Sequence, residues 1–525
     1  MAFNKAWISF LLNMKISKIY QAIALLGLLG VTQMALASVT TEIHTAMQPQ
    51  IQAQSQGLPP SIRQKMNELA LSDSEVSIWV KPINATAPLI NHRADTPRVP
   101  ASTQKLISTF MALDVLGGNH HWYTRIYQKG VVANGTLYGD IVIQGQGDPS
   151  LTHARLQALL EYLPYKGIRH IAGDIIIDNT TFQGVAGNAN AFDGQGIRAY
   201  NAQPNAFLVN FGTLEIDMLP SGYYRQTGQY DRFGEPVLAF IPTDNSKLAL
   251  QILPPLADFN APKVLNATGG DCNSTPNFHL SETALVPTGN AQTGCGRMTQ
   301  WLTFANGDVF AVKAVKGVWQ GIDPQFKGVV RLRGINEKLP LGLPIVSYPS
   351  RPLSTQIYDV NQHSNNVMTE QVALSLPLAL GETVSTYPKT FAMINTWWSK
   401  HFKSTPPVMT KASGLCRDCY IKPNAMGEML EFAYHHKEFA TFRESLPIAG
   451  KTGTMAKLSK RNPTNPAIGR AFIKTGTLDD VSSMAGYVYD SQNNAYVVVG
   501  MINAKGAGWK GVAVLDEMLA VVASR

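Results

Sequence analysis

The chain has 525 residues, of which 45% are hydrophobic and 15% charged, and its formal net charge is +8. This composition excludes a disordered chain and provides a buried core for two or three domains. The positive charge favours attraction to an anionic surface or polymer. Because the lysines and arginines are dispersed, apart from a basic loop at 457–461, the sequence does not indicate a nucleic-acid partner.

The first 37 residues have the features of a secretory signal peptide. Lys15 and Lys18 precede an apolar run over 22–31, and a small-x-small cleavage pattern follows at 35–37. The run is too short to span a bilayer comfortably, and no cysteine follows the cleavage pattern to carry a lipid. The sequence therefore predicts an exported, periplasmic protein that begins near Ser38 and has no stable membrane anchor.

The N-terminal part of the mature chain alternates short predicted strands and helices. Apolar periodicity predicts a helix over 61–71, strands over 76–80 and 89–91, and an amphipathic helix over 102–116 that is stopped by Gly117-Gly118. Ser102 lies in the first turn of this last helix, and Lys105 follows three residues later on the same face. Such spacing allows a lysine amine to take the proton of a serine hydroxyl.

The Ser-x-x-Lys spacing alone is weak evidence, because a chain of this length contains roughly two such strings by chance. The alternative for Ser102 is a simple helix cap. The helix N-terminus would in either case favour negative charge at that end.

A β-rich insertion is predicted from 119 to 345. Short β-branched runs at 131–132, 140–143 and 173–178 are separated by Gly, Asn and Asp. The later part, about 215–325, is richer in turns and indicates a nested subdomain. The insertion divides the remaining mature chain into 38–118 and 346–525, which together form one discontinuous domain.

Regular periodicity returns in the C-terminal part. We expect helices over 366–380 and 390–402, then strands over 471–473, 484–489 and 496–502. The final helix, about 511–523, is apolar on most faces but lacks a basic face. It is therefore predicted to pack on the sheet and not to lie on a membrane.

The four cysteines form two local groups. Cys272 and Cys295 lie in one segment rich in Gly, Asn and Thr, where a bridge would close a loop that has little core. Cys416 and Cys419 form a Cys-x-x-Cys, which could be redox-active, half of a zinc site or a small disulfide. A second Cys-x-x-Cys is missing from the sequence, which favours the disulfide.

Two further motifs follow Ser102 and Lys105 in a defined order. Ser364-Asn365-Asn366 is a Ser-x-Asn at the start of a predicted helix, and Lys474-Thr475-Gly476-Thr477 ends an apolar strand. Ser-x-x-Lys, Ser-x-Asn and Lys-Thr-Gly in this order are the signature of penicillin-binding proteins and serine β-lactamases.

More than 250 residues separate Lys105 from Ser364. This layout resembles the class C low-molecular-mass penicillin-binding proteins, peptidase family S13, of the D-Ala-D-Ala carboxypeptidase/endopeptidase type, and the similarity covers nearly the whole mature chain. Local matches at 100–102, 145–149, 413–417 and 469–471 support it. The resemblance implies an α/β (α+β) penicillin-binding-protein/β-lactamase-like fold, in which helices flank an antiparallel sheet and a β-rich insertion separates the first two motifs.

The resemblance also implies roles for the motif residues. Ser102 would attack the carbonyl of the penultimate D-alanine of a peptidoglycan stem peptide and Lys105 would accept its proton, while β-lactams would acylate Ser102 as inhibitors. Ser364 would relay the proton and Asn366 would orient Lys105 and the substrate. Lys474 is the fifth expected catalytic residue and, with Thr475, would hold the terminal carboxylate. The expected substrate-binding residues are Thr475, Gly476, Thr477 and Arg417. The resemblance implies no cofactor and no metal.

Two positions depart from a simple match to the family. A second Lys-Thr-Gly occurs at 451–453, but it follows Ala449-Gly450 and not an apolar strand, so we assign the catalytic role to Lys474. Cys416 stands where such proteins often have serine, which puts the local loop geometry in question but not the reaction.

Single features of the sequence also suggest three alternative functions. A serine β-lactamase shares the acylation machinery, but the class A deacylation string Glu-x-x-Leu-Asn is missing between Ser364 and Lys474. A metallohydrolase could use the histidine pairs at 120–121 or 435–436, but the sequence has no His-Glu-x-x-His. A non-catalytic cell-wall-binding protein would not require intact motifs. The sequence leaves the balance of carboxypeptidase and endopeptidase, the diamino acid and the oligomeric state open.

Overall fold

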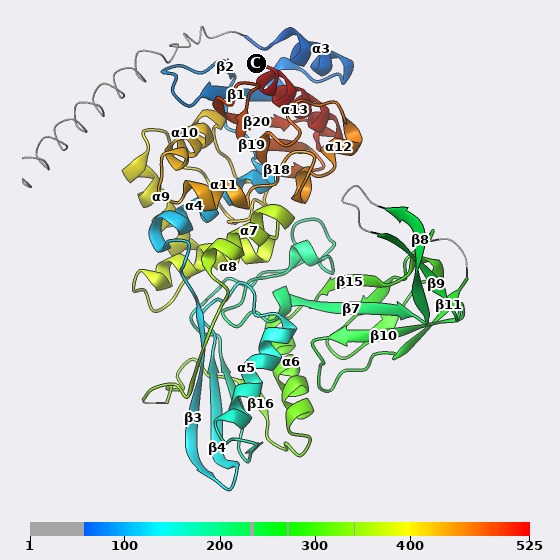
Figure 1. Ribbon diagram of the computed structural model, residues 1–525. Coiled ribbons are helices and arrows are strands. Elements are labelled where there is room, and N and C mark those ends of the chain that lie inside the picture. The colour runs from blue at the N-terminus through cyan, green and yellow to red at the C-terminus, as the bar shows by residue number, and fades with distance from the viewer. Residues whose placement is uncertain (1–56, 231–235, 270–271, 341) are drawn as a thin grey trace, which may run out of the picture. The chain divides into compact units, whose positions relative to one another are not determined.

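The computed structural model describes residues 57–230, 236–269, 272–340 and 342–525 (Figure 1). The predicted signal peptide, residues 1–37, lies outside the described residues. None of the helices in the described ranges has the length and apolar character needed to cross a membrane.

Strands from the two ends of the described chain form one antiparallel sheet. Its order is β18-β19-β20-β1-β2, so β1 pairs with β20 and Val76 lies opposite Ile502. Figure 1 shows the blue N-terminal strands beside the orange and red C-terminal ones. This sheet confirms the strands predicted at both ends of the chain. The bounds are β1 Val76–Pro82, β2 Ile90–His92, β18 Ala471–Leu478, β19 Val481–Tyr489 and β20 Ala495–Asn503.

Helices cover both faces of this sheet, because alternate residues of its central strands enter two different cores. Val498 and Ile502 pack with α3 (Pro60–Glu68) and α13 (Ala507–Ala523), whereas Val499 and Met501 face the opposite core. The helices of that opposite core are α4 Lys105–Leu116, α7 Leu353–His363, α8 Asn366–Ala379, α9 Tyr387–His401, α10 Pro423–Tyr434 and α11 Phe439–Ser445. The short helix α12 (Leu458–Arg461) lies on the α3 and α13 side, where Leu458 is buried.

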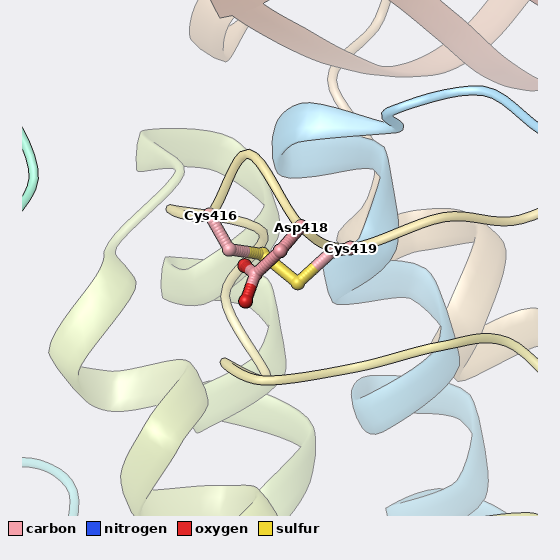
Figure 2. A group of neighbouring side chains, drawn as sticks. All are labelled: Cys416, Asp418 and Cys419. Atoms are coloured by element: carbon pink, nitrogen blue, oxygen red, sulfur yellow. A yellow bond between two sulfur atoms is a disulfide. The ribbon is translucent and has the colours of Figure 1, made fainter.

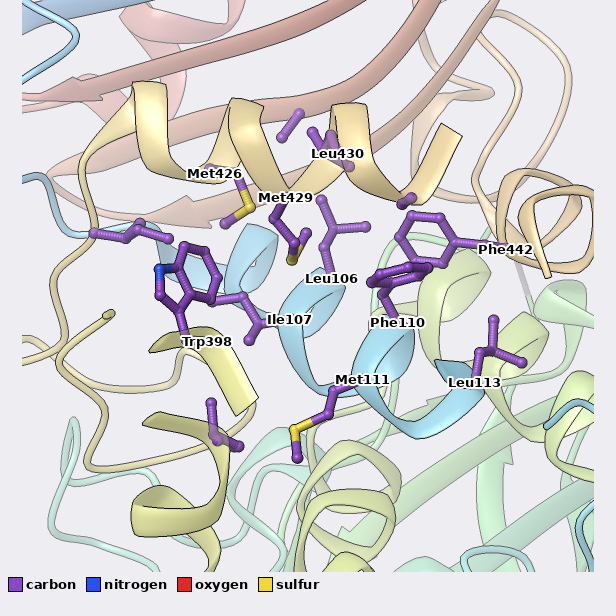
Figure 3. Close-up of a cluster of buried hydrophobic side chains, with 14 of the residues drawn as sticks. Leu106, Ile107, Phe110, Met111, Leu113, Trp398, Met426, Met429, Leu430 and Phe442 are labelled. Carbon is purple, nitrogen blue, oxygen red and sulfur yellow. The ribbon is translucent and has the colours of Figure 1, made fainter. Parts of the chain in front are cut away.

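Helix α4 is the centre of the second core. Figure 3 shows Leu106, Phe110 and Leu113 of α4 between α10 and the other helices, with Trp398 and Phe442 packed around them. Residues 105–113 of α4 are all buried. The helix is therefore fixed on every side, and its N-terminal end is held at one position relative to the sheet.

The sequence predicts that this helix begins at Ser102, but the structure places a 3₁₀ turn, Ala101–Gln104, before α4. Ala101 has a positive φ of 46°, which interrupts the regular helix just before Ser102. The backbone N–H of Thr103 donates to Pro100 O at 3.3 Å, an i to i+3 bond. Residues three apart eclipse each other in such a turn, so Ser102 and Lys105 still share one side.

The inserted segment contains a first sheet of order β16-β6-β4-β3-β17, with β5 beside β4. Helices α5 (His153–Tyr165) and α6 (Gly307–Ile322), which the sequence did not predict, pack on it through Leu160 and Trp319. Because β17 pairs with β3, we propose that the insertion extends to Pro349 and not only to residue 345. The bounds are β3 Tyr123–Ala133, β4 Thr136–Gln144, β5 His170–Ile171, β6 Ile175–Asp178, β16 Val330–Leu332 and β17 Val346–Pro349.

A second sheet lies within the insertion and has the order β14-β11-β10-β7-β15. Its strands do not pair with those of the first sheet, so we propose a nested subdomain that spans the strands from 213 to 303, and both sheets contribute to one buried cluster. Two hairpins, β8 with β9 and β12 with β13, accompany it. The bounds are β7 Thr213–Pro220, β8 Gly222–Tyr230, β9 Pro236–Pro242, β10 Lys247–Leu253, β11 Val264–Thr268, β12 Phe278–Leu280, β13 Leu285–Pro287, β14 Ala291–Gln292 and β15 Met298–Thr303.

Both predicted disulfides are present. Cys272 is bonded to Cys295, and Cys416 is bonded to Cys419. Figure 2 shows the second bond at the turn between Cys416 and Cys419, with Asp418 beside it. Both sulfurs of this pair are buried and used in the bond, which supports a structural role for the Cys-x-x-Cys and not a zinc site.

Candidate active site

The structure brings the three motifs together from three different elements. Ser102 lies on the 3₁₀ turn before α4, Asn366 is the first residue of α8, and Lys474 lies on β18. Ser364 ends α7 in a left-handed conformation with φ 56°, which turns the chain sharply into α8. Residues separated by more than 100 positions thus meet at one edge of the sheet.

Lys105 is fully buried and contacts three oxygen atoms. Its Nζ lies 2.8 Å from Ser102 Oγ, 2.7 Å from Asn366 Oδ1 and 2.6 Å from the Ser413 carbonyl. Burial, and secondly the Lys474 cation, hold the pKa of Lys105 well below its ordinary value, while Glu370 acts in the opposite direction. The lowered pKa favours the neutral amine, which is the form that can accept a proton from a neighbouring hydroxyl.

Lys474 forms a second hydroxyl–amine pair. Its Nζ lies 2.9 Å from Ser364 Oγ and 2.9 Å from the Thr475 carbonyl, and its side chain is fully buried. Burial lowers the pKa of Lys474 to about 7. A ligand carboxylate beside this amine would favour its charged form, so carboxylate binding and protonation of Lys474 are expected to support each other.

Strand β18 approaches the nucleophile closely at Gly476. A Cβ at this position would lie 2.7 Å from the Ser102 backbone nitrogen and 2.8 Å from Pro100 O, which only a glycine avoids. Ser483 on β19 donates to the same Pro100 oxygen at 2.6 Å. The Gly of the Lys-Thr-Gly motif therefore sets the distance between the strand and Ser102.

One edge of β18 is open beside Ser102. The first part of the strand pairs with the preceding loop, since the Ala449 N–H donates to Ala471 O at 2.9 Å and the Ile473 N–H donates to Pro447 O at 2.8 Å. Among the described residues, no strand pairs with this edge beyond Ile473, and β18 ends the order of its sheet. The backbone from Lys474 to Leu478 can thus bind an extended peptide.

Glu370 is a site residue that the sequence analysis missed. It is 4% exposed, and its carboxylate accepts hydrogen bonds from the backbone N–H groups of Ala412 at 3.0 Å and Ser413 at 2.9 Å. The Ser413 carbonyl is in turn one of the three partners of Lys105. A signal was present in the sequence, because Glu370 is an acid within an apolar helix, four residues after Asn366 and so on the same face.

Replacing Glu370 by glutamine is expected to lower the maximal rate of Ser102 acylation about tenfold, because a charge-assisted contact to the Ser413 segment becomes neutral. The acid limb of the pH–rate profile should move to lower pH. Glu370 raises the pKa of Lys105, so its neutralisation leaves that pKa lower and the amine neutral at more acidic pH.

The measurement is the second-order rate of penicillin acylation between about pH 5 and 11, a range that includes the ordinary pKa values of lysine and histidine. Glu428→Gln is the matched control, because Glu428 also binds two consecutive backbone N–H groups, of Lys403 and Ser404, away from Lys105. An acid limb that stays in place in the Glu370 variant would contradict the assignment.

The remaining predicted substrate-binding residues lie around this centre. Thr475 Oγ1 lies 2.8 Å from Thr454 Oγ1, and the Thr477 side chain is exposed one residue after Gly476, where β18 approaches Ser102. Arg417 is exposed at the rim, where its guanidinium pairs with Asp480 and lies 5.4 Å from the centre of the Phe192 ring. Direct contact of Arg417 with a substrate stays a prediction.

The structure separates the two Lys-Thr-Gly strings. Lys451 is exposed on a loop, and its Nζ lies beside Gly469, away from the Ser102 and Ser364 hydroxyls. Gly450 and Gly453 around it have positive φ values of 69° and 52°, so the segment cannot continue as a strand. Of the two lysines, Lys474 contacts the Ser-x-Asn motif.

The fold and the site together define a class of protein. A five-stranded antiparallel sheet with helices on both faces carries a Ser–Lys pair, a Ser-x-Asn and a Lys-Thr-Gly at one edge. This combination is that of the serine acyl-transfer enzymes of the penicillin-binding-protein and β-lactamase type.

Comparison with known proteins identifies the family. The model of the D-Ala-D-Ala carboxypeptidase 3 (S13) family matches residues 59–521, and the chain belongs to this family. The predicted membership of peptidase family S13 and the predicted D-Ala-D-Ala carboxypeptidase activity, a hydrolase activity, are thereby confirmed.

Curated relatives and solved structures agree with the family. The chain is 24% identical to the D-alanyl-D-alanine carboxypeptidase DacB of Haemophilus influenzae over 449 residues, which are 83% of this chain and 86% of that protein. It is 22% identical to the D-alanyl-D-alanine carboxypeptidase of Actinomadura sp. strain R39, over 80% of this chain and 76% of that one. The crystal structure of penicillin-binding protein 4 from H. influenzae matches with a TM-score of 0.70 and 17% identity, over 89% of this chain and all of that one, which confirms the predicted fold.

Proposed function

We propose that this protein is a serine D-Ala-D-Ala carboxypeptidase that cleaves peptidoglycan stem peptides through an acyl-enzyme on Ser102. The observation that carries the proposal is the contact of the buried Lys105 amine with Ser102 Oγ and Asn366 Oδ1. This contact joins a nucleophile, a base of lowered pKa and an orienting amide in one rigid group.

Acylation begins when Lys105 accepts the Ser102 proton and Oγ attacks the carbonyl of the penultimate D-alanine. The negative charge that develops on the carbonyl oxygen is met by the backbone N–H groups of Ser102 and Thr477, and one such donor is typically worth about 3 kcal/mol in the transition state. The peptide C–N bond then breaks, and Ser364 relays a proton to the leaving amine of the terminal D-alanine. Water next hydrolyses the ester and releases Ser102.

The C-terminal carboxylate is the recognition mark of the substrate. Lys474, in its charged form, and the Thr475 hydroxyl bind this carboxylate. The open edge of β18 pairs with the extended peptide behind it. A penicillin carries a carboxylate next to a strained acyl group, so the same contacts would direct it onto Ser102 as a covalent inhibitor. H. influenzae penicillin-binding protein 4 has been solved in complex with a β-lactam, which supports this expectation.

The same attack on a D-Ala carbonyl can cut a peptide cross-link, so DD-endopeptidase activity belongs to the proposal. Both substrates lie in the cell wall, which fits the signal peptide proposed at residues 1–37 and a periplasmic location. The net charge of +8 favours approach to an anionic wall polymer.

Incubation with purified muropeptides, monomeric and cross-linked, tests the proposed function. We expect mass analysis to show loss of one terminal D-alanine from monomers, or separation of cross-linked dimers, and pretreatment with benzylpenicillin should suppress both products. Intact muropeptides together with turnover of penicillin to penicilloate would instead indicate a β-lactamase.

A further inference from the structure

A cavity of about 570 Å³ lies at the end of α8 opposite Asn366, outside the catalytic site. Its volume lies within the usual range of ligand sites, about 300–1,000 Å³. None of the motif residues lines it. Its wall combines the inserted segment with the C-terminal end of α8, through residues that include Trp122, Tyr123, Gln144, Asp178, Arg333 and Leu378.

The topology of the inserted sheet explains why a cavity forms there. β4, β6 and β16 are parallel neighbours. Gln144 ends β4, Asp178 ends β6, and Arg333 follows β16, so the three side chains line the cavity from the carboxyl ends of the strands. Ligands of open α/β sheets bind outside this end of parallel strands.

The polar side chains of the wall are planar, and Asp178 compensates the charge of Arg333. Arg333 Nε lies 2.9 Å from Asp178 Oδ1, and Gln144 Nε2 donates to Asp178 Oδ2 at 3.3 Å. Arg125 bonds to the Gln146 side chain. At the Arg333 end of the wall an anion would have to break the pair with Asp178, so this part of the wall favours an uncharged ligand with several hydroxyl or amide groups.

Aromatic side chains complete the cavity. Trp122 is 4% exposed, and its Nε1–H has no hydrogen-bond partner among the described residues, although a buried indole N–H usually has one. Tyr123 is 40% exposed at the same wall. An unpaired buried donor and a partly exposed tyrosine ring, with the Arg125 guanidinium 5.8 Å from its centre on one face, suit a sugar ring, which offers hydroxyl oxygens at its edge and an apolar face for stacking.

We propose that this cavity binds N-acetylated amino sugars of the glycan strand that carries the stem peptide. The inference rests on the proposed function for the nature of the polymer. Helix α8 has 14 residues and therefore a length of about 20 Å between the cavity and Asn366. An extended peptide covers this length in about six residues. Because the stem peptide is shorter than this, the cavity would hold a sugar of the same glycan strand next to the one that carries the peptide.

Calorimetric titration with tetra-N-acetylchitotetraose, a neutral glycan without peptide, tests the site. The protein is first acylated with benzylpenicillin, which blocks Ser102. We expect saturable binding of the glycan to the acylated protein, and at least tenfold weaker binding to the double variant Tyr123→Ala/Gln146→Ala. Tyr138→Ala is the matched control, because Tyr138 is 64% exposed on β4 but outside the cavity.

The outcomes separate this inference from the proposed function. Failure of benzylpenicillin to label Ser102 would refute the proposed function, whereas normal labelling without glycan binding overturns only the glycan site. Equal binding to the double variant and wild type also overturns it, as does displacement of the glycan by a sugar-free stem peptide. Unchanged melting temperatures and acylation rates show that the variants are folded.

Discussion

Replacing Ser102 by alanine is expected to abolish covalent labelling of this protein by penicillin. Ser102 Oγ is the hydroxyl beside the lowered-pKa amine of Lys105, at 2.8 Å, and its removal leaves no atom to form the ester. Intact-mass measurement after incubation with benzylpenicillin should show one adduct on the wild-type chain and none on the variant, and peptide mapping should place the adduct on Ser102.

Ser108→Ala provides a matched control. Ser108 lies three residues after Lys105, as Ser102 lies three before it, and it is buried in α4. Its hydroxyl has no hydrogen-bond partner among the described residues, so its removal should leave labelling within about twofold of wild type. An adduct mapped to a residue other than Ser102 would refute the assignment of the nucleophile.

Replacing Lys474 by alanine should slow acylation by benzylpenicillin at least about a hundredfold, the scale of one preorganised charge-assisted contact made in the transition state. The variant loses the cation for the ligand carboxylate and the amine that lies 2.9 Å from Ser364 Oγ. Lys451→Ala should change the rate less than about tenfold, because Lys451 is exposed on a loop away from both hydroxyls.

Second-order acylation rates of both variants decide between the two lysines. The comparison is controlled internally, since each substitution removes one lysine from a Lys-Thr-Gly string. A larger loss in the Lys451 variant than in the Lys474 variant would reverse the assignment.

The sequence predicts the secondary structure correctly where apolar residues recur at a regular spacing over a whole element. The strands at both ends of the chain and the helices at 366–379 and 387–401 agree with their apolar spacing. The sequence did not predict helices α5 and α6, because β-branched runs on either side of them indicate strands throughout the insertion. Helix α5 also contains Pro164, which disfavours a helix. The irregular start of the nucleophile helix could not be read, since it depends on the positive φ of Ala101.

The residues of the candidate site likewise fall into those that the sequence predicts and those that it does not. Ser102, Lys105, Ser364, Asn366 and Lys474 belong to motifs with fixed spacing, and their chemistry is local enough to be read from the sequence. Glu370 acts through the backbone of a loop more than 40 residues away, a contact that spacing does not encode. The cavity likewise arises from strand ends that come together through parallel pairing.

The pairing of β1 with β20 has a consequence for the time at which the protein becomes active. Val76 lies opposite Ile502, so the sheet closes only when strands from both ends of the chain are present. A growing polypeptide already contains Ser102 and Lys105 but lacks the strand that presents Lys474 and the strand on which β1 must pair. A chain that stops before Asn503 therefore lacks part of this sheet. We expect catalytic activity to appear only after the last strand has been synthesised and has paired with β1.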